Sequence, residues 1–245
     1  MRLNDFLSFV SLLAKKNGLS QPYLVGGVPR DKILGILDRL NDIDVTSGDA
    51  DVHALARLLA GKFQNSGMFK EFPDGHSSLQ IKGSLKVDFS SNFKIPNVEK
   101  IVGKYLSELE QEVWSRDFTC NTILIPFDNL ESVKDLTGRG IRDIQDKNLV
   151  TCLSPEVTLG LDHKRIIRIL YLNAKLGFSI DGRVLDFVKK NPSLISDGVS
   201  PDYLSKKMKK TIEYKSPETI SLIKDLGLAP YLPLKMKEFQ EITNG

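Results

Sequence analysis

The feature that most constrains this chain is a pair of aspartates, Asp42 and Asp44, separated by one isoleucine. The surrounding residues predict a short apolar strand over 23–25, a Gly26-Gly27 loop, a short helix and a second strand that carries both aspartates. Because side chains alternate faces along a strand, the two carboxylates point the same way. Neighbouring carboxylates repel each other, so we expect a positive group to hold them. Two Mg²⁺ ions shared with a nucleotide triphosphate would supply that charge.

The residues before this strand suit a phosphate ligand. Gly26 and Gly27 let the backbone approach phosphates closely, because neither residue has a Cβ atom. Arg30 supplies a cation for the same anion. An isolated D-x-D or Gly-Gly pair is more often a solvated turn or edge-strand feature. The combination of strand, Gly-Gly, arginine, helix and D-x-D strand favours a nucleotide site instead.

This stretch resembles the head of the tRNA nucleotidyltransferase and bacterial poly(A) polymerase family, which includes the class II CCA-adding enzymes. The family pattern is L-V-G-G-x-V-R-D, followed by D-x-D and a threonine. The matching positions are Leu24, Val25, Gly26, Gly27, Arg30, Asp31, Asp42, Asp44 and Thr46. Pro29 stands where the family usually has valine, and proline suits the first turn of a helix.

Residues 115–122 resemble a second family motif, R-R-D-F-T-I-N-A. Arg116, Asp117 and Asn121 match it, whereas Ser115 replaces the first arginine. The resemblance implies that this segment contacts the sugar and phosphates of the incoming nucleotide. We therefore expect Arg116, Asp117 and Asn121 to bind the nucleotide, whereas Ser115 removes one possible phosphate ligand.

A further acidic residue, Asp88, lies on a predicted strand over 85–89. If this strand lies beside the one that carries Asp42 and Asp44, Asp88 completes a cluster of three carboxylates for two Mg²⁺ ions. The alternative is an ordinary polar residue on an alternating strand, and the residues alone do not decide between the two. The resemblance favours catalysis, because the family places an acid in the corresponding strand.

The segment 155–178 carries a third set of candidates. Asp162, Arg165 and Arg168 recur at helical spacings, so we expect them to share one helix face. The resemblance implies that Asp162 and Arg165 form a protein template for the base of C or A, with Arg168 nearer the phosphates. Leu161 replaces the family glutamate that is expected to steady the template arginine. Without the resemblance, the pattern is typical of an ion pair on a solvated helix.

The apolar periodicity predicts an α+β fold. The resemblance implies a polymerase β-like nucleotidyltransferase head with a mixed β-sheet over residues 1–150, and a helical neck and partial body for base recognition and RNA binding over 151–245. Helices are predicted over 3–15, from about 50 to 60, and over 97–114, 183–190, 201–213, 217–226 and 233–241. The side chains of the 97–114 helix that are expected to face inward are Val98, Ile101, Val102, Tyr105 and Leu106.

Composition adds weaker constraints. The net charge of +3 permits an RNA partner without requiring one. Two cysteines without metal-ligand spacing indicate a reducing compartment, and no apolar run is long enough to cross a membrane, so we expect a cytoplasmic protein. A lysine-rich run over 206–215 is by default a solvated face, but it could also hold an RNA backbone.

The function expected from these observations is template-independent addition of C and/or A to the 3′ end of tRNA. ATP and CTP are the expected substrates, Asp42, Asp44 and Asp88 the catalytic metal ligands, and Mg²⁺ the metal. One alternative is a poly(A) polymerase or an enzyme that adds only CC or only A. Another is a non-catalytic RNA-binding remnant of the fold, which the retained pair of repelling aspartates disfavours. The sequence does not predict an oligomeric state.

Overall fold

A computed structural model describes residues 3–37, 42–65, 67–81 and 85–233. The chain divides into two compact units, Met1–Ile144 and Gln145–Gly245, whereas the sequence pattern predicts a boundary at residue 150. The predicted helix over 233–241 lies, beyond residue 233, outside the described residues. Within them, no helix is long and apolar enough to span a membrane.

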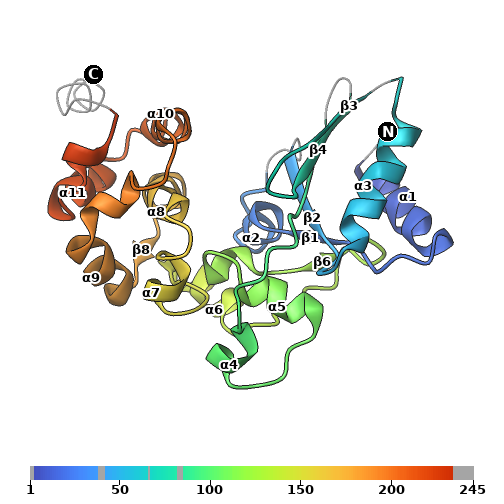
Figure 1. Ribbon diagram of the computed structural model, residues 1–245, viewed down its shortest axis with the longest axis horizontal. Coiled ribbons are helices and arrows are strands. Elements are labelled where there is room, and N and C mark those ends of the chain that lie inside the picture. The colour runs from blue at the N-terminus through green and yellow to red at the C-terminus, as the bar shows by residue number, and fades with distance from the viewer. Residues whose placement is uncertain (1–2, 38–41, 66, 82–84, 234–245) are drawn as a thin grey trace. The chain divides into compact units, whose positions relative to one another are not determined.

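The first unit is built on a six-stranded mixed sheet (Figure 1). Its strands lie in the order β3-β4-β5-β2-β1-β6, with β2 and β5 parallel and the other neighbours antiparallel. The α+β fold with a mixed sheet is therefore confirmed. The strands in chain order are β1 (Tyr23–Val25), β2 (Asp42–Thr46), β3 (Gly67–Glu71), β4 (Ser77–Ile81), β5 (Leu85–Phe89) and β6 (Ile125–Pro126).

The main core lies on one face of this sheet, where α1 (Leu3–Lys16) and α3 (Asp51–Lys62) pack (Figure 1). Alternation along the strands directs Ile43, Val45 and Val87 into this core. Both helices were predicted from their apolar stripes. The remaining helices of the unit are α2 (Gly27–Ile33), α4 (Val98–Val102), α5 (Glu108–Trp114), the 3₁₀ turn η1 (Thr119–Asn121) and α6 (Gly140–Gln145).

The prediction of one continuous helix over 97–114 is wrong. The chain forms α4 and α5 instead, because Gly103 adopts φ = 80° and ends α4. Ser107 then begins α5 with a capping box, in which its hydroxyl accepts from the backbone N–H of Glu110. Two side chains expected to face inward are consequently on the surface, Ile101 at 47% and Tyr105 at 87% exposure.

The second unit is mainly helical. Its helices are α7 (Pro155–Thr158), α8 (Lys164–Leu176), α9 (Gly182–Lys190), α10 (Pro201–Ile212) and α11 (Pro217–Asp225), with 3₁₀ turns η2 (Pro192–Ile195) and η3 (Ala229–Tyr231). The apolar side of α8 is buried, and α8 contacts both α10 and α11. The predicted helices over 183–190, 201–213 and 217–226 are confirmed. A short parallel pair, β7 (Asn148–Leu149) with β8 (Ser179–Ile180), was not predicted.

Candidate active site

The predicted acidic residues of the first unit lie together on the sheet face opposite the main core. β2 pairs with β5 in parallel, so that Asp44 is the register partner of Asp88 and Asp42 that of Lys86. The condition on which the assignment of Asp88 depended, that its strand lies beside the aspartate strand, is thus met. Asp42 and Asp44 are exposed and Asp88 is partly buried, while the alternate residues Ile43 and Val87 are buried. The alternation therefore presents all three carboxylates on one side of the sheet.

Lys86 lies among these carboxylates, which sequence reasoning did not predict. Its ammonium group contacts Oδ2 of Asp88 and lies 3.4 Å from Oδ1 of Asp42. Burial acts to lower the pKa of Lys86, but the hydrogen bond and charge of Asp88, followed by Asp42, outweigh it and hold this pKa above the ordinary lysine value. A signal was present, because Lys86 is two residues from Asp88 on an alternating strand.

The donor set of this face suits a hard divalent cation, which prefers carboxylate oxygens. Among the described residues, however, no three His, Cys, Asp or Glu side chains are gathered as a ready ligand group. The ammonium group of Lys86 contacts Asp88 and lies 3.4 Å from Asp42, so a positive charge already lies between these two carboxylates. The oxygens of Asp42, Asp44 and Asp88 fit a divalent cation by their chemistry.

Gly26 brings the first loop against the aspartate strand. It adopts φ = 78°, and a Cβ atom built at this position would lie 2.6 Å from Oδ2 of Asp44. The backbone at Gly26 can approach the carboxylate this closely because glycine has no side chain and tolerates a positive φ. The glycine loop and the aspartate strand thus form one continuous surface.

Arg30, Asn121 and Asp117 form a hydrogen-bonded chain behind the loop. Nη1 of Arg30 donates to Oδ1 of Asn121 at 2.6 Å, and Nδ2 of Asn121 donates to Oδ1 of Asp117 at 3.2 Å. Nε and Nη2 of Arg30 donate to Oδ1 of the adjacent Asp31. Arg30 is only 3% exposed, so in this conformation it joins the two predicted motifs rather than projecting into solvent.

Glu112 is a buried acid that sequence reasoning missed. Its carboxylate accepts from Nη2 of Arg116 at 2.6 Å, from Oγ of Ser90 at 3.2 Å and from Oγ1 of Thr46 at 3.3 Å. It therefore ties Arg116 to the end of the aspartate strand. Its contacts with Thr46 and Ser90 depend on tertiary packing, whereas Arg116 lies four residues from Glu112, a spacing that favours a local ion pair.

Ser115, which replaces an arginine of the family motif, has a structural role. Its hydroxyl donates to the carbonyl of Gln111 at 2.6 Å and accepts from the backbone N–H of Ile95 at 2.7 Å. The side chain is buried and connects the end of α5 to the segment after β5. A charged arginine would have to leave this position, so the substitution changes local packing as well as charge.

In the second unit, Asp162 and Arg165 are in contact but do not share a helix. Asp162 precedes α8 and its Oδ1 accepts from the backbone N–H of Lys164, so the expectation of one common helix face is wrong for Asp162. Its Oδ2 lies 3.4 Å from Nε of Arg165. Nη1 of Arg165 donates to the carbonyl of Thr158 at 3.3 Å. Arg168 is partly buried on α8, and Leu161 is 56% exposed.

A cluster of tyrosines and lysines lies on α8, α10 and the turn after α10. Nζ of Lys207 is 4.6 Å from the ring centroid of Tyr171 and 6.0 Å from that of Tyr203. Tyr171 packs edge-on against Tyr214, with centroids 6.0 Å apart. Further lysines of the 206–215 run are exposed. Cationic groups over aromatic faces are a common feature of single-stranded nucleic-acid sites.

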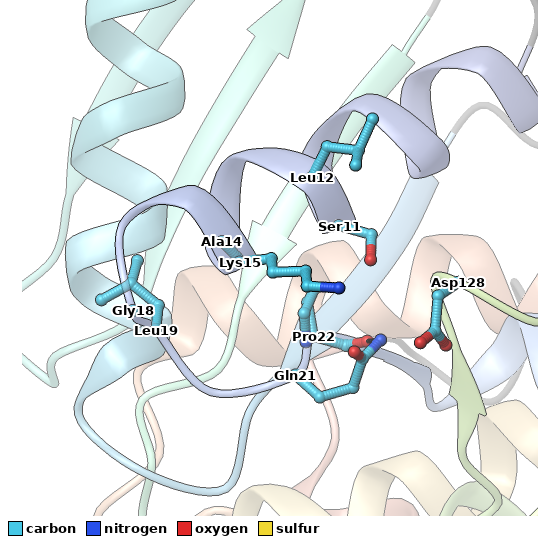
Figure 2. A pocket seen from close by; sticks show the side chains of 9 residues that line it. All are labelled: Ser11, Leu12, Ala14, Lys15, Gly18, Leu19, Gln21, Pro22 and Asp128. Atoms are coloured by element: carbon cyan, nitrogen blue, oxygen red, sulfur yellow. Dashed lines mark hydrogen bonds between the residues drawn. The ribbon is translucent and has the colours of Figure 1, made fainter.

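A cavity of about 520 Å³ lies at the end of α1 and the start of β1, away from the predicted residues (Figure 2). Figure 2 shows the polar ends of Lys15, Gln21 and Asp128 directed into the same space. None of the predicted site residues lines it. The carboxylate face is identified as the candidate site by its chemistry, because it gathers Asp42, Asp44 and Asp88 on one side of the sheet.

The sequence of this chain matches the model of a known protein family. Residues 22–150, which contain both motifs and all three carboxylates, match the poly A polymerase head domain. The match covers slightly more than half of the chain and ends shortly after the first unit.

Comparison with individual proteins points the same way. The chain is 26% identical over 211 residues to the tRNA nucleotidyltransferase cca2 of Schizosaccharomyces pombe, covering 76% of this chain and 42% of that protein. It is 24% identical over 196 residues to the CCA-adding enzyme of Lacticaseibacillus paracasei, covering 78% and 46%. The chain therefore spans less than half the length of these relatives.

Solved structures share the fold. The CCA-adding enzyme of Bacillus stearothermophilus in complex with CTP is similar with a TM-score of 0.72 at 18% identity, covering 99% of this chain and 58% of that one. A tRNA nucleotidyltransferase complexed with a primer tRNA and an ATP analog is similar with a TM-score of 0.66 at 25% identity, covering 95% and 66%.

Proposed function

The chain belongs to the poly A polymerase head domain family, and from this premise we propose that it adds nucleotides to the 3′ end of an RNA without a template. The substrates we propose are CTP and ATP, and the acceptor is tRNA. The observation that carries the proposal is the pairing of β2 with β5, which puts Asp42, Asp44 and Asp88 on one open face beside the Gly26-Gly27 loop. The names of the relatives, tRNA nucleotidyltransferase and CCA-adding enzyme, support the same reaction.

The three carboxylates would hold divalent cations. The family is one of metal-dependent nucleotidyltransferases, and we propose Mg²⁺ as the ion. When bound, it would activate the RNA 3′ hydroxyl and stabilise the leaving pyrophosphate. The chain's own part is to present Asp42 and Asp44 from a strand that is paired on both sides, so that their oxygens need little reorganisation.

The triphosphate and sugar would lie along the glycine loop and the 116–121 segment. Gly26 and Gly27 allow the backbone to approach the phosphates, and Arg30 and Arg116 supply positive charge. The bonds from Arg30 to Asn121 and from Asn121 to Asp117 support a shared role, because they link the two motifs into one rigid group. Glu112 would orient Arg116 from behind.

We assign base selection to Asp162 and Arg165, with Arg168 contributing charge towards the phosphates. Their direct contact supports this, because it leaves a carboxylate as acceptor beside a guanidinium donor. The lysine and tyrosine cluster on α8 and α10 is the proposed surface for the RNA. On this division the first unit performs the chemistry and the second selects the base and binds RNA.

The test is an extension assay on tRNA that lacks its 3′ end, with each NTP supplied singly and with CTP and ATP together. We expect C to be added first and A after it, in the presence of Mg²⁺. Asp42→Ala and Asp44→Ala should abolish incorporation, because each removes a metal ligand. The melting temperature of Asp44→Ala should be unchanged or higher, since this change removes one of two repelling charges. Asp42→Ala removes the same repulsion but also an exposed ion pair with Lys86, so its melting temperature should change little.

The outcomes separate the alternatives. Long tracts of A alone would identify a poly(A) polymerase, and extension with one nucleotide alone would identify a partial CC- or A-adding enzyme. Intact RNA binding with no incorporation under any condition would identify a non-catalytic remnant. Near-normal rates in Asp44→Ala would remove this residue from the mechanism.

The cytoplasmic location expected from the sequence stays a prediction. Two yeast relatives, from Saccharomyces cerevisiae and Candida glabrata, are named as mitochondrial CCA tRNA nucleotidyltransferases. Fluorescence microscopy of the tagged full-length protein in its own cells would decide the compartment.

A further inference from the structure

Lys86 places a positive charge between the carboxylates of Asp42 and Asp88. It is the register partner of Asp42 and is two residues from Asp88, so all three side chains leave the sheet on the same side. Its ammonium group contacts Asp88 and lies 3.4 Å from Asp42. The Lys86 side chain is 40% exposed, so the ammonium group can move towards solvent without unfolding β5.

These contacts occupy the oxygens that a divalent cation would need. A carboxylate oxygen that bonds an ammonium group offers less negative potential to a metal, and the two cations repel each other at short distance. When both are present, the doubly charged ion gains more from the carboxylates than the singly charged lysine does. Metal binding and release of Lys86 are therefore coupled steps.

We propose that Lys86 is a positioning residue that acts as an internal counter-ion for Asp42 and Asp88 and exchanges places with the divalent cation. It keeps the carboxylates together before metal binds and sets the metal concentration at which the site fills. This inference rests on the proposed function, because it takes these carboxylates as the metal ligands.

The test measures Mn²⁺ binding to the full chain without nucleotide, from the decrease of the electron paramagnetic resonance signal of free Mn²⁺. Lys86→Met keeps an unbranched side chain that is one atom shorter and removes its charge. We expect Mn²⁺ to bind this variant roughly fivefold more tightly than the wild type, the scale of a partly exposed ion pair. Lys86→Gln, which is also neutral but can still donate to Asp88, should behave in the same way.

Two variants serve as controls. Lys86→Arg keeps the charge and should bind Mn²⁺ as the wild type does. Lys94→Met removes a lysine that is paired with Glu108 at 3.6 Å elsewhere in the same unit, so it should leave Mn²⁺ affinity unchanged. A second readout is thermal stability, where added Mn²⁺ should raise the melting temperature of Lys86→Met more than that of the wild type.

The outcomes separate this inference from the proposed function. If Asp44→Ala abolishes Mn²⁺ binding but neither neutral variant at position 86 tightens it, the counter-ion role is wrong and the metal site stands. If the neutral variants bind Mn²⁺ more weakly than the wild type, Lys86 supports the bound state and the proposed exchange is also wrong. If neither the wild type nor Asp44→Ala binds Mn²⁺, the metal assignment itself fails.

Discussion

Gly26 is the residue at which loop and strand come closest. Its positive φ and its contact with Asp44 are two separate reasons for glycine, and they can be tested separately. Gly18 has a similar φ of 66°, but a Cβ atom there would have nothing within 4 Å. Gly18→Ala therefore measures the cost of a positive φ without a steric contact.

We predict that Gly18→Ala reduces folding stability by about 1 kcal/mol, the cost of a positive φ in alanine. Gly26→Ala should cost more, because its φ of 78° is combined with a ψ of −127°, which lies outside the left-handed helical region. Only Gly26→Ala should also abolish nucleotide incorporation, because its methyl group must push the carboxylate of Asp44 aside. Chemical unfolding followed by the fluorescence of Trp114, the single tryptophan, measures the first effect, and the extension assay measures the second. Equal incorporation by both variants would show that the contact at Gly26 is unimportant.

At the residue scale, the sequence predicted groups whose signal is local. Alternation along a strand was sufficient to orient Asp42 and Asp44 together and to offer Asp88 as a third acid. Glu112 gave no such signal, because its contacts with Thr46 and Ser90 join positions 66 and 22 residues away. Ser115 was interpreted only as a missing phosphate ligand, and its hydrogen bond from Ile95 became evident only from the fold.

At the scale of elements, the helix predictions succeeded where no capping residue interrupted the predicted segment. The predictions of α1 and α3 rested on apolar stripes, whereas those of α9, α10 and α11 rested on the prolines that divide this part of the chain, two of which begin α10 and α11. The segment 97–114 also has apolar residues at helical intervals, but Gly103 and the Ser107 cap divide it. Apolar periodicity predicts which residues could face a core, whereas capping residues predict where a helix begins and ends.

The capping box of α5 should contribute measurably to folding stability, and this contribution should depend on pH. Hydrogen bonds from the backbone and hydroxyl of Ser107 hold the pKa of Glu110 below its ordinary value, and Lys104 adds to this while burial opposes it. Because the folded-state pKa is lowered, this stabilisation is complete above the pKa of the unfolded chain. It disappears as the pH falls through the lower pKa of the folded chain.

We predict that Ser107→Ala costs about 1 kcal/mol at pH 7, the usual value for removal of an N-cap. The difference from the wild type should shrink as the pH falls below the folded-state pKa of Glu110, because the protonated carboxyl has no such advantage in either protein. Urea titrations at several pH values, followed by Trp114 at the end of α5, measure it. Ser8→Ala, at an exposed position inside α1, is the matched control and should change little at any pH.

At the scale of the whole molecule, the chain divides into two compact units of different architecture. The mixed sheet of the first unit and the helices of the second were both expected from the pattern of elements. The strand order could not be deduced from the sequence alone, because the parallel pairing of β2 with β5 joins segments separated by two further strands. The small pair of β7 with β8 was missed because two-residue strands are too short to show alternation.

The lysine and tyrosine cluster leads to a prediction about RNA. Lys207→Ala should weaken binding of a truncated tRNA and lower the slope of log affinity against log salt by about 1, the effect expected when one phosphate-binding lysine is removed. Lys189→Ala removes an exposed lysine at the end of α9 and should leave the slope unchanged. Fluorescence anisotropy at several salt concentrations measures both. Identical slopes for the two variants would indicate that net charge alone governs binding.

The interior position of β2 has a consequence for how this protein can change over generations. β2 is hydrogen-bonded to β1 on one side and to β5 on the other. A shift of this strand by one residue against its neighbours would turn Asp42 and Asp44 towards the core and Ile43 towards water. Evolution can therefore insert or delete residues in the hairpins and on helix surfaces more easily than within β2, where one extra residue would change the register of the strand.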